Sequence, residues 1–377
     1  MAMKKRPWAA AFVVGVAALA LVACSTTGTA TPGATSDPAA QNQEPQGLEG
    51  RPSLDDFCGD QQVKVAYVVG FGGNAWRKTA LAEIQDEAAK CDGVTVDYYD
   101  ANGDQTQYIS MVNSATAQGY DAIITYDDFG AAAIPALKKA FEAGVVVIPF
   151  EGDPTGTVGE DYTGFVSLDL DYEAEQWAEF LGRALPDGGG VAYLGGPAGA
   201  PLSEYLYTAL EKNLGSGPVE LLGDGPIATN WTPTDTQKAA SGLFSQFPDL
   251  AGIVADYLGG EGPAIVNAFT NANQPLVPLA GGSATNELVC QYHDLSASNP
   301  GFQLFSLDGD IAIGRVALRQ AVAIFVGAQD DESWVFRRSV GIDTTKDIVP
   351  ECKPNMPPDL PLNSTLTDEA LQEVFTN

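Results

Sequence analysis

The sequence predicts an α/β protein with two similar lobes, each a doubly wound parallel sheet covered by helices. Short β-branched runs alternate with segments of helical periodicity, the connections between them are short, and the same alternation occurs twice along the chain. The chain has 377 residues, of which 45% are hydrophobic. This length fits two domains of about 150 residues each plus tails, with enough apolar mass for two cores.

The first lobe is predicted to begin at Val63, where a β-branched run leads to Gly70. The next segment has helical periodicity, because Trp76, Leu81 and Ile84 recur on one face. We expect strands at 63–69, 94–99, 120–126 and 145–150, and helices at 75–90, 105–118 and 131–143.

The second lobe repeats this pattern. Its strands are expected near 190–195, 218–222, 251–255 and 276–280, and its helices near 171–185, 201–214, 232–246 and 261–272. A further strand is expected at 302–307 and a further helix at 310–326, and apolar crossings near 163–168 and 302–308 join the lobes. The tail from Val349 onward is rich in proline and is predicted to end in a helix over 367–375.

The N-terminus is typical of an exported lipoprotein. Basic residues at 4–6 precede an apolar run over 8–23, which ends in Leu21-Val-Ala-Cys24 and resembles a lipidation signal at Cys24. The following segment to about residue 56 is rich in Ser, Thr, Gly, Ala and Pro, which predicts a flexible tether. We therefore expect an exported protein that is lipid-anchored to the outer face of the cytoplasmic membrane, or held in the periplasm.

These patterns divide the chain into four parts. They are a signal peptide (1–23), the lipidated cysteine with its tether (24–57), an N-terminal lobe (58–168 plus 309–340), and a C-terminal lobe with a surface tail (169–308 plus 341–377).

The charge balance excludes several classes of function. Acidic residues outnumber basic residues by 49 to 19, and a surface this negative repels nucleic acid. The single histidine, His293, argues against a His-rich metal site and against a His-dependent catalytic triad. We therefore expect no catalytic residue, no metal and no cofactor, and a binding protein rather than an enzyme.

The cysteines other than Cys24 predict two disulfides, because an exported compartment is oxidising. Cys58 precedes the first strand and Cys91 follows the first helix, so in a parallel sheet both lie at the same edge. This favours Cys58–Cys91 and leaves Cys290–Cys352, with four free thiols as the alternative.

A glycine-rich loop, Gly70-Phe-Gly-Gly-Asn-Ala-Trp76, follows the first strand and has two interpretations. As G-x-G-x-x-A, with an acid at Asp97 or Asp100, it fits a dinucleotide fingerprint and an exported dinucleotide-dependent oxidoreductase. However, nicotinamide cofactors are scarce outside the cytoplasm, and the chain has no twin-arginine signal. The other interpretation is recognition of a small polar ligand by backbone, by Asn74 and by the apolar face of Trp76, unless Trp76 belongs to the core.

The order of these segments resembles the ribose-type (type I) substrate-binding proteins of sugar ABC transporters, over roughly residues 60–345. The motifs that carry the resemblance are Asn74-Ala-Trp76, Asp100-Ala-Asn-Gly-Asp104, Gln118-Gly-Tyr-Asp-Ala-Ile-Ile124, the run 143–149 leading to Glu151, Gly195-Gly-Pro-Ala-Gly199, and Gly314 after Asp308. The resemblance implies the type I periplasmic-binding-protein fold, in which two lobes close over a ligand at a hinge. It also places Glu151 where this family often has a sugar-binding aspartate, and Asp308 on the hinge side.

Ligands of open α/β sheets bind beyond the carboxyl ends of the strands, and here those ends are rich in acids. The candidate ligand-binding residues are Asn74, Trp76, Asp100, Asp127, Asp128, Glu151, Glu204, Trp231, Asp256 and Asp308. Carboxylates accept strong hydrogen bonds from hydroxyl groups, and aromatic faces pack on sugar rings. The alternative for many of these acids is a place on the solvated surface.

The resulting prediction is a monomeric solute-binding protein that captures a small neutral sugar or polyol by hinge closure and delivers it to an ABC permease. No arginine is evident at the strand ends, so we expect sugar acids and sugar phosphates to bind poorly. A cationic ligand such as an amino sugar is the alternative ligand class. A ligand-sensing lipoprotein that signals to a membrane receptor is the alternative role.

Overall fold

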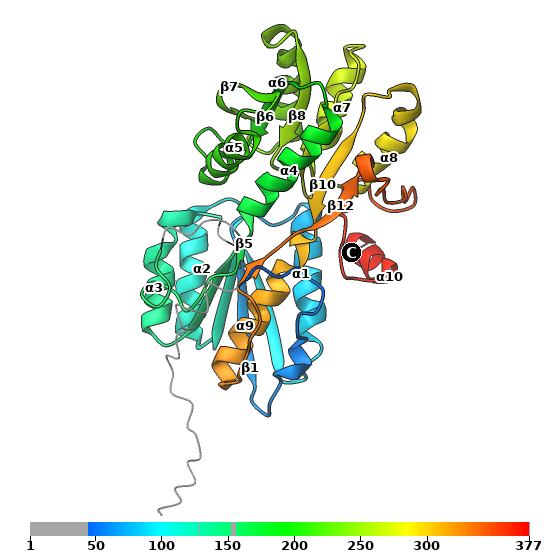
Figure 1. Cartoon of the computed structure of the whole chain (residues 1–377). Helices are drawn as coiled ribbons and strands as arrows, with labels where there is room; N and C mark the ends of the chain where they lie inside the picture. The colour runs from blue at the N-terminus through cyan, green and yellow to red at the C-terminus, as the bar shows by residue number, and fades with distance from the viewer. Residues whose placement is uncertain (1–43, 127, 152–155, 377) are drawn as a thin grey trace, which may run out of the picture. The chain divides into compact units, whose positions relative to one another are not determined.

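The computed structural model describes residues 44–126, 128–151 and 156–376, and it has two lobes with one main sheet each (Figure 1). The sheet of the N-terminal lobe has the order β2 (Val94–Asp100), β1 (Val63–Val69), β3 (Ala122–Tyr126) and β4 (Val146–Phe150), with all strands parallel. β4 is buried along its whole length, as is typical of a strand covered on both faces.

Helices cover both faces of this sheet. α1 (Ala75–Ala88) and α9 (Ile313–Val326) pack on one face, where Ile84 and Val316 meet Val65 and Tyr67. α2 (Gln105–Gln118) and α3 (Ile134–Glu142) form the core of the other face. α9 therefore returns to the N-terminal lobe after the chain has built most of the other lobe (Figure 1).

The C-terminal lobe has a six-stranded sheet. Its order is β12 (Ser339–Asp343), β10 (Leu304–Asp308), β9 (Leu279–Gly282), β8 (Leu250–Ala255), β6 (Gly189–Gly195) and β7 (Val219–Ala228), and only β12 runs antiparallel to its neighbour. α4 (Leu170–Ala184) and α5 (Pro201–Leu214) pack on one face. The other face carries α6 (Pro233–Gln246), α7 (Glu261–Asn271) and α8 (Asn286–Leu295).

Three crossings join the lobes. β5 (Ser167–Leu168) and β11 (Val335–Phe336) pair in parallel as a small separate sheet, so two crossings lie side by side. The third runs from β10 to α9 through Gly309, whose φ of 101° favours glycine, and a short 3-10 helix at Asp310–Ala312. The predicted crossings near 163–168 and 302–308 thus lead into two of the three, and the crossing at β11 was not predicted.

The segment before β1 is part of the fold rather than of a free tether. The backbone N–H of Gln46 donates to the Val335 carbonyl at 3.0 Å, and the Gln46 carbonyl accepts from the Arg337 N–H at 2.9 Å. These bonds place a third backbone segment beside the β5–β11 pair. Leu54, in a 3-10 helix over Leu54–Asp56, is fully buried. The predicted tether over 24–57 therefore differs from the structure in its last part, where residues from 44 onward contact the body.

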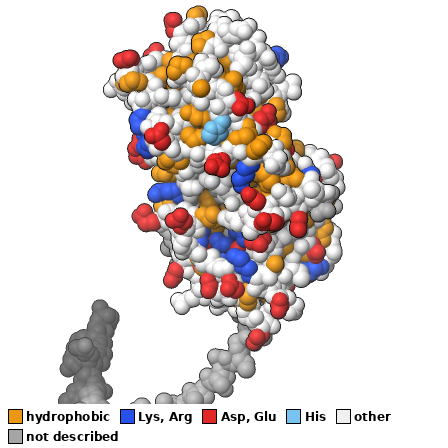
Figure 2. Space-filling model, turned by 90° about the vertical axis from the view of Figure 1, so that its right-hand side faces the viewer, with side chains coloured by type: hydrophobic (Ala, Val, Ile, Leu, Met, Phe, Trp, Pro, Cys, Tyr) orange, Lys and Arg blue, Asp and Glu red, His pale blue; other side chains and the backbone are white. Residues whose placement is uncertain are grey.

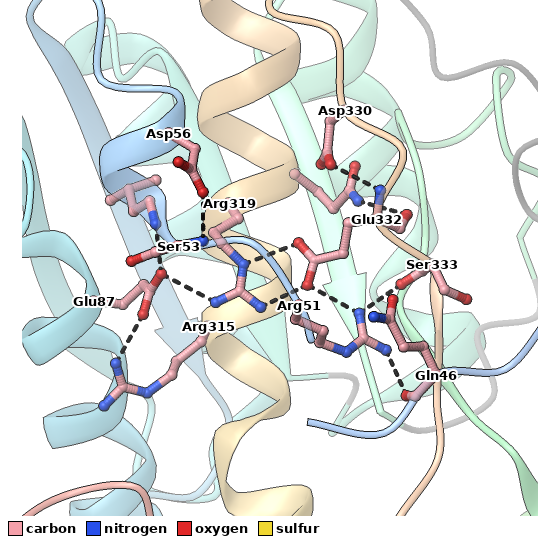
Figure 3. A network of polar contacts seen from close by, with 12 residues as sticks. Gln46, Arg51, Ser53, Asp56, Glu87, Arg315, Arg319, Asp330, Glu332 and Ser333 are labelled. Carbon is pink, nitrogen blue, oxygen red and sulfur yellow. Dashed lines mark hydrogen bonds and ion pairs between the residues drawn. The ribbon is translucent and has the colours of Figure 1, made fainter. Parts of the chain in front are cut away.

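Buried ion pairs fasten this segment to the helices of the N-terminal lobe (Figure 3). Arg319 of α9 contacts Glu87 of α1 at 3.0 Å and Glu332 at 2.6 Å. Glu332 also pairs with Arg51 at 2.9 Å, and Glu87 pairs with Arg315 at 2.8 Å. All five side chains are at most 5% exposed, so positive and negative groups alternate in a region from which water is largely excluded.

Both predicted disulfides are present. Cys58–Cys91 has a Cα–Cα distance of 5.4 Å and joins the N-terminal segment to the end of α1. Cys290–Cys352 has a Cα–Cα distance of 4.7 Å and joins α8 to the C-terminal tail. The tail ends in α10 (Asp368–Thr376), close to the predicted 367–375.

Candidate functional site

Charged and aromatic side chains gather where the crossings meet the carboxyl ends of the strands. The N-terminal lobe supplies residues at strand ends and in the first turn of α1. The crossings and the C-terminal lobe, through α4 and the end of β9, supply the groups opposite them. The members are Trp76, Arg77, Tyr126, Asp128, Glu151, Glu173, Ser283, Asp310 and Arg338, which we call the interlobe cluster.

Arg338 is the centre of the interlobe cluster. It directly precedes β12, and its Nη2 lies 3.6 Å from Glu151 Oε1 and 3.4 Å from Asp310 Oδ2. Its Nη1 lies 3.1 Å from Glu173 Oε2 in the first turn of α4. One buried guanidinium therefore joins a carboxylate of the N-terminal lobe to two carboxylates that follow crossings.

Arg77 and two aromatic rings form the N-terminal half of the cluster. Arg77 pairs with Asp128 at 2.6 Å and lies 3.4 Å from the centre of the Tyr126 ring. Trp76 meets Tyr126 edge to face at 5.5 Å, and its indole N–H donates to Asp310 Oδ2 at 3.2 Å. Trp76 also packs against Ile311, so it belongs both to a small apolar cluster and to the polar site.

A second polar group lies at the strand ends of the C-terminal lobe. Asp256, which follows β8, accepts hydrogen bonds from Trp231 Nε1 at 2.7 Å and from Ser203 Oγ at 2.6 Å. Burial raises the pKa of Asp256 to about 6, and Arg338 opposes this rise. Asp256 therefore lies within electrostatic reach of the interlobe cluster.

Four polar atoms of the interlobe cluster are buried without a hydrogen-bond partner among the described residues. Two are acceptors, Glu151 Oε2 and Glu173 Oε1, and two are donors, Arg77 Nη1 and Arg338 Nε. A buried polar atom without a partner costs about 1–3 kcal/mol, so such atoms are rare in folded proteins. Both kinds occurring together is typical of a site for a polar ligand.

The backbone is strained at the same place. Glu151, Trp231 and Ser283 have φ values of 61°, 51° and 58°, in the left-handed region that non-glycine residues seldom adopt. Ser283 donates to Asp310 at 2.8 Å. Strain of this kind concentrates at functional sites, where the surrounding structure holds the residue in place.

The carboxyl groups of the cluster have raised pKa values. Burial, reinforced by the charge of Asp310, raises the pKa of Glu151 to about 8, although Arg338 and Arg77 oppose it. Burial likewise raises the pKa of Glu173 to about 7. Asp308, which ends β10, is raised to about 7 by burial and by Asp310.

These pKa values predict that the protein loses stability as the pH rises from about 5 to about 8. A carboxyl group whose pKa is raised by folding binds more protons in the folded state, so its contribution is complete below the unfolded pKa and is lost above the folded one. Asp310, Arg338, Arg77 and Tyr126 are the groups that act on Glu151. Urea unfolding at several pH values measures this slope, and Glu151→Gln should reduce it. A stability that stays level or increases over this range would contradict the assignment.

Five of the predicted site residues lie in these two polar groups, and the others lie elsewhere. Trp76, Asp128, Glu151, Trp231 and Asp256 are brought together as described above. Asp308 is buried beside them, and its Oδ1 accepts from the backbone N–H of Ala284 at 2.7 Å.

The remaining predicted residues have other surroundings. Asn74 caps α1, accepting from the Arg77 N–H at 2.7 Å. Asp100 accepts from the N–H groups of Gly72 and Asn102 and holds the glycine loop. Glu204 is exposed on α5 outside the cluster, while Asp127 and the lipidation residue Cys24 lie outside the described residues. Acidic side chains are scattered over the face shown in Figure 2. Of the described candidate acids, Glu204 is the one on the exposed surface.

The expectation that no arginine lies at the strand ends is wrong. Arg77 and Arg338 are both buried in the interlobe cluster, at 9% and 7% exposure. Arg77 directly follows Trp76, so its position could have been noticed. Arg338 and Glu173 sit beside the crossings, where no strand-end pattern points to them. Asp310 lies two residues beyond the end of β10, so its position could also have been noticed.

The glycine loop does not offer its amides to a phosphate. The N–H of Gly70 donates to Asp128 Oδ2 at 2.6 Å, and the N–H of Gly72 donates to Asp100 Oδ1 at 2.9 Å. A dinucleotide site needs such amides free for the pyrophosphate, and two carboxylates at this position repel it. The loop geometry therefore disfavours the dinucleotide interpretation.

Neither a metal centre nor a membrane span appears in the part of the chain that the structure describes. Within residues 44–126, 128–151 and 156–376, no three His, Cys, Asp or Glu side chains are grouped to hold a metal ion. No helix in these ranges is long and apolar enough to cross a bilayer.

Two doubly wound lobes, three crossings and polar groups at the facing strand ends define a two-lobed binding protein of the type I fold. The chain belongs to the periplasmic binding protein domain family, whose model matches residues 65–329. This is a family of binding proteins rather than of enzymes. No curated protein matches the chain.

Several solved structures are similar in fold. An ABC transporter solute-binding protein from Agrobacterium vitis with bound D-fucose has a TM-score of 0.64 at 16% identity, over 78% of this chain and 98% of that chain. A periplasmic solute-binding protein from Actinobacillus succinogenes with bound D-allose has a TM-score of 0.63 at 19% identity, over 76% and 100%. A second Agrobacterium vitis protein, with bound α-D-tagatopyranose, has a TM-score of 0.64 at 17% identity, over 77% and 100%.

Proposed function

We propose that this protein is an extracytoplasmic, lipid-anchored solute-binding protein that captures a small neutral sugar or polyol and delivers it to an ABC permease. The observation that carries the proposal is the pair of unpartnered acceptors beside the pair of unpartnered donors in the interlobe cluster. A hydroxyl group donates one hydrogen bond and accepts others, so a ligand with several hydroxyl groups can satisfy both kinds of atom.

Charge and shape both favour a neutral ligand. Arg77 is already paired with Asp128, and Arg338 is already engaged by Glu151, Glu173 and Asp310, so neither guanidinium is free to pair with a ligand carboxylate or phosphate. The rings of Trp76 and Tyr126 supply apolar faces of the kind that pack on the C–H face of a sugar. The expectation that sugar acids and phosphates bind poorly therefore rests on the existing partners of both arginines, and not on a lack of arginine.

The place of the protein in transport is supported by independent features. The similar structures named above include solute-binding proteins of ABC transporters with bound monosaccharides. The signal sequence ending at Cys24 supports export and lipid anchoring. Narrow crossings between two lobes suit closure over the ligand by hinge motion, and the closed form would then dock on the permease.

An amino sugar is the second candidate ligand. Glu151, Glu173 and Asp310 share one guanidinium, so above the pKa values of Glu151 and Glu173 the cluster around Arg338 has more negative than positive groups. An ammonium group on the ligand would balance this charge. The sensing role would use the same site, with a membrane receptor in place of the permease.

Native mass spectrometry of the mature protein with a panel of neutral monosaccharides and polyols tests the proposal. We expect a one-to-one complex with at least one of them. Glu151→Ala should weaken that complex about ten-fold to a hundred-fold, because a buried hydrogen-bonding group of the complex that loses its partner costs about 1–3 kcal/mol. Glu204→Ala, an exposed acid outside the cluster, is the matched control and should bind like the unmodified protein. Equal weakening by both variants, or the absence of any complex, would contradict the proposal.

A further inference from the structure

The C-terminal tail connects the lobes a fourth time. We call residues 352–376 the C-terminal strap. Its first part is fastened to the C-terminal lobe by the Cys290–Cys352 disulfide. Backbone bonds follow, from the N–H of Asn286 to Leu360 at 2.9 Å and from the N–H of Leu362 to Ala284 at 3.1 Å.

The strap then reaches the N-terminal lobe at a single buried carboxylate. Glu83 of α1 accepts from Ser364 Oγ at 2.6 Å and from the Thr365 N–H at 2.7 Å, and Thr365 Oγ1 also donates to it. Glu83 is fully buried and pairs with Arg315 of α9 as well. Beyond these bonds, α10 lies beside α1 (Figure 1).

The strap is folded on itself rather than loosely laid over the surface. Met356, Leu360 and Leu371 form a small buried cluster between its two ends. Lys353 near its start pairs with Asp368 in the first turn of α10 at 2.6 Å. These contacts hold the start of the strap close to α10.

The middle of the strap lies next to elements of both lobes that supply the interlobe cluster. Glu83, which Ser364 and Thr365 contact, is on α1, whose first turn carries Trp76 and Arg77. In the C-terminal lobe, Ala284 is bonded to Leu362 and follows Ser283, which donates to Asp310. The strap thus connects the two lobes, as Arg338 does directly within the interlobe cluster.

We infer that the C-terminal strap holds the two lobes in the arrangement that forms the ligand site, and that Ser364 and Thr365 are positioning residues for ligand capture. Bonds between the lobes that exist before the ligand arrives raise the population of the binding-competent arrangement, and affinity increases with that population. The part of this inference that concerns affinity rests on the proposed function, whereas the part that concerns lobe position does not.

The distance between the lobes, measured without ligand, tests the inference. Spin labels at Ala117→Cys in α2 and Glu211→Cys in α5, both exposed, report on the two lobes by double electron–electron resonance. We expect a longer and broader distance distribution in Ser364→Ala/Thr365→Val and in a chain that ends at Asn363. Thr376→Val is the matched control, because the Thr376 hydroxyl bonds only within α10, and it should leave the distribution unchanged.

Ligand affinity supplies the second readout. The double variant should bind the sugar about ten-fold more weakly than the control, a typical size for coupling between sites. Unchanged distance distributions in both strap variants would overturn the inference. The absence of sugar binding in every variant, together with longer distances in the strap variants, would instead contradict the proposed function and leave the strap supported. If the chain that ends at Asn363 does not fold, Ser364→Ala/Thr365→Val still tests the inference.

Discussion

Arg319→Met is expected to lower the free energy of unfolding by about 3–5 kcal/mol, the range found when one partner of a buried ion pair is removed. The substitution keeps much of the side-chain volume but leaves Glu87 and Glu332 without the guanidinium between them (Figure 3). Both carboxylates are buried and cannot recover this loss from water. Urea unfolding followed by circular dichroism measures the change.

A surface ion pair of the same lobe is the control for this prediction. Lys64 and Asp97 are 3.7 Å apart and about half exposed, so Lys64→Met should change stability by less than about 1 kcal/mol. If the two variants lose similar amounts of stability, the buried ion pairs do not fasten the N-terminal segment to α1 and α9 as described.

Arg338→Met is expected to lower ligand affinity by roughly a hundred-fold, or about 3 kcal/mol. Arg338 is the only side chain that contacts Glu151, Glu173 and Asp310 together among the described ion pairs. Without it, Glu151, Glu173 and Asp310 lose the guanidinium that joins them, and the unpartnered Nε donor is also lost. Calorimetric titration of the variant with the bound sugar measures the effect.

The neighbouring residue gives a matched control. Arg337 is 40% exposed, pairs with Asp169 at 2.7 Å and lies over the Tyr172 ring, away from the interlobe cluster. Arg337→Met should therefore reduce affinity far less than Arg338→Met. Similar affinities for the two variants would mean that the ligand does not contact the guanidinium of Arg338.

The parallel sheets could be predicted because their strands are continuous apolar runs. β1 agrees with the predicted 63–69, and α2 and α5 agree with 105–118 and 201–214. α8 and β12 were missed. α8 is a short helix that buries only residues of its first turn, and β12 is a short antiparallel strand at a sheet edge. Tertiary contacts, including the Cys290–Cys352 disulfide, hold these elements in place.

The candidate site was predictable to the extent that strand ends supply it. Glu151 and Asp256 directly follow strands and Asp128 lies two residues beyond one, so topology alone places them at the carboxyl edges. Glu173 and Arg338 reach the same point from crossings that lie far apart in the sequence. Pairing between β5 and β11 positions Arg338, and two-residue strands leave too weak a signal to be recognised in one sequence.

Isothermal titration calorimetry of the mature protein with a panel of ligands distinguishes a site for neutral sugars from a site for charged ones. The panel contains pentoses, hexoses and polyols, together with amino sugars, sugar acids and sugar phosphates. The structure predicts one-site binding of a neutral sugar or polyol and weak or no binding of acidic ligands, because carboxyl groups already engage Arg77 and Arg338. Tight binding of an amino sugar alone would identify the ligand as an amino sugar, the second candidate, instead of a neutral sugar. Tight binding of an acidic ligand alone would contradict the account.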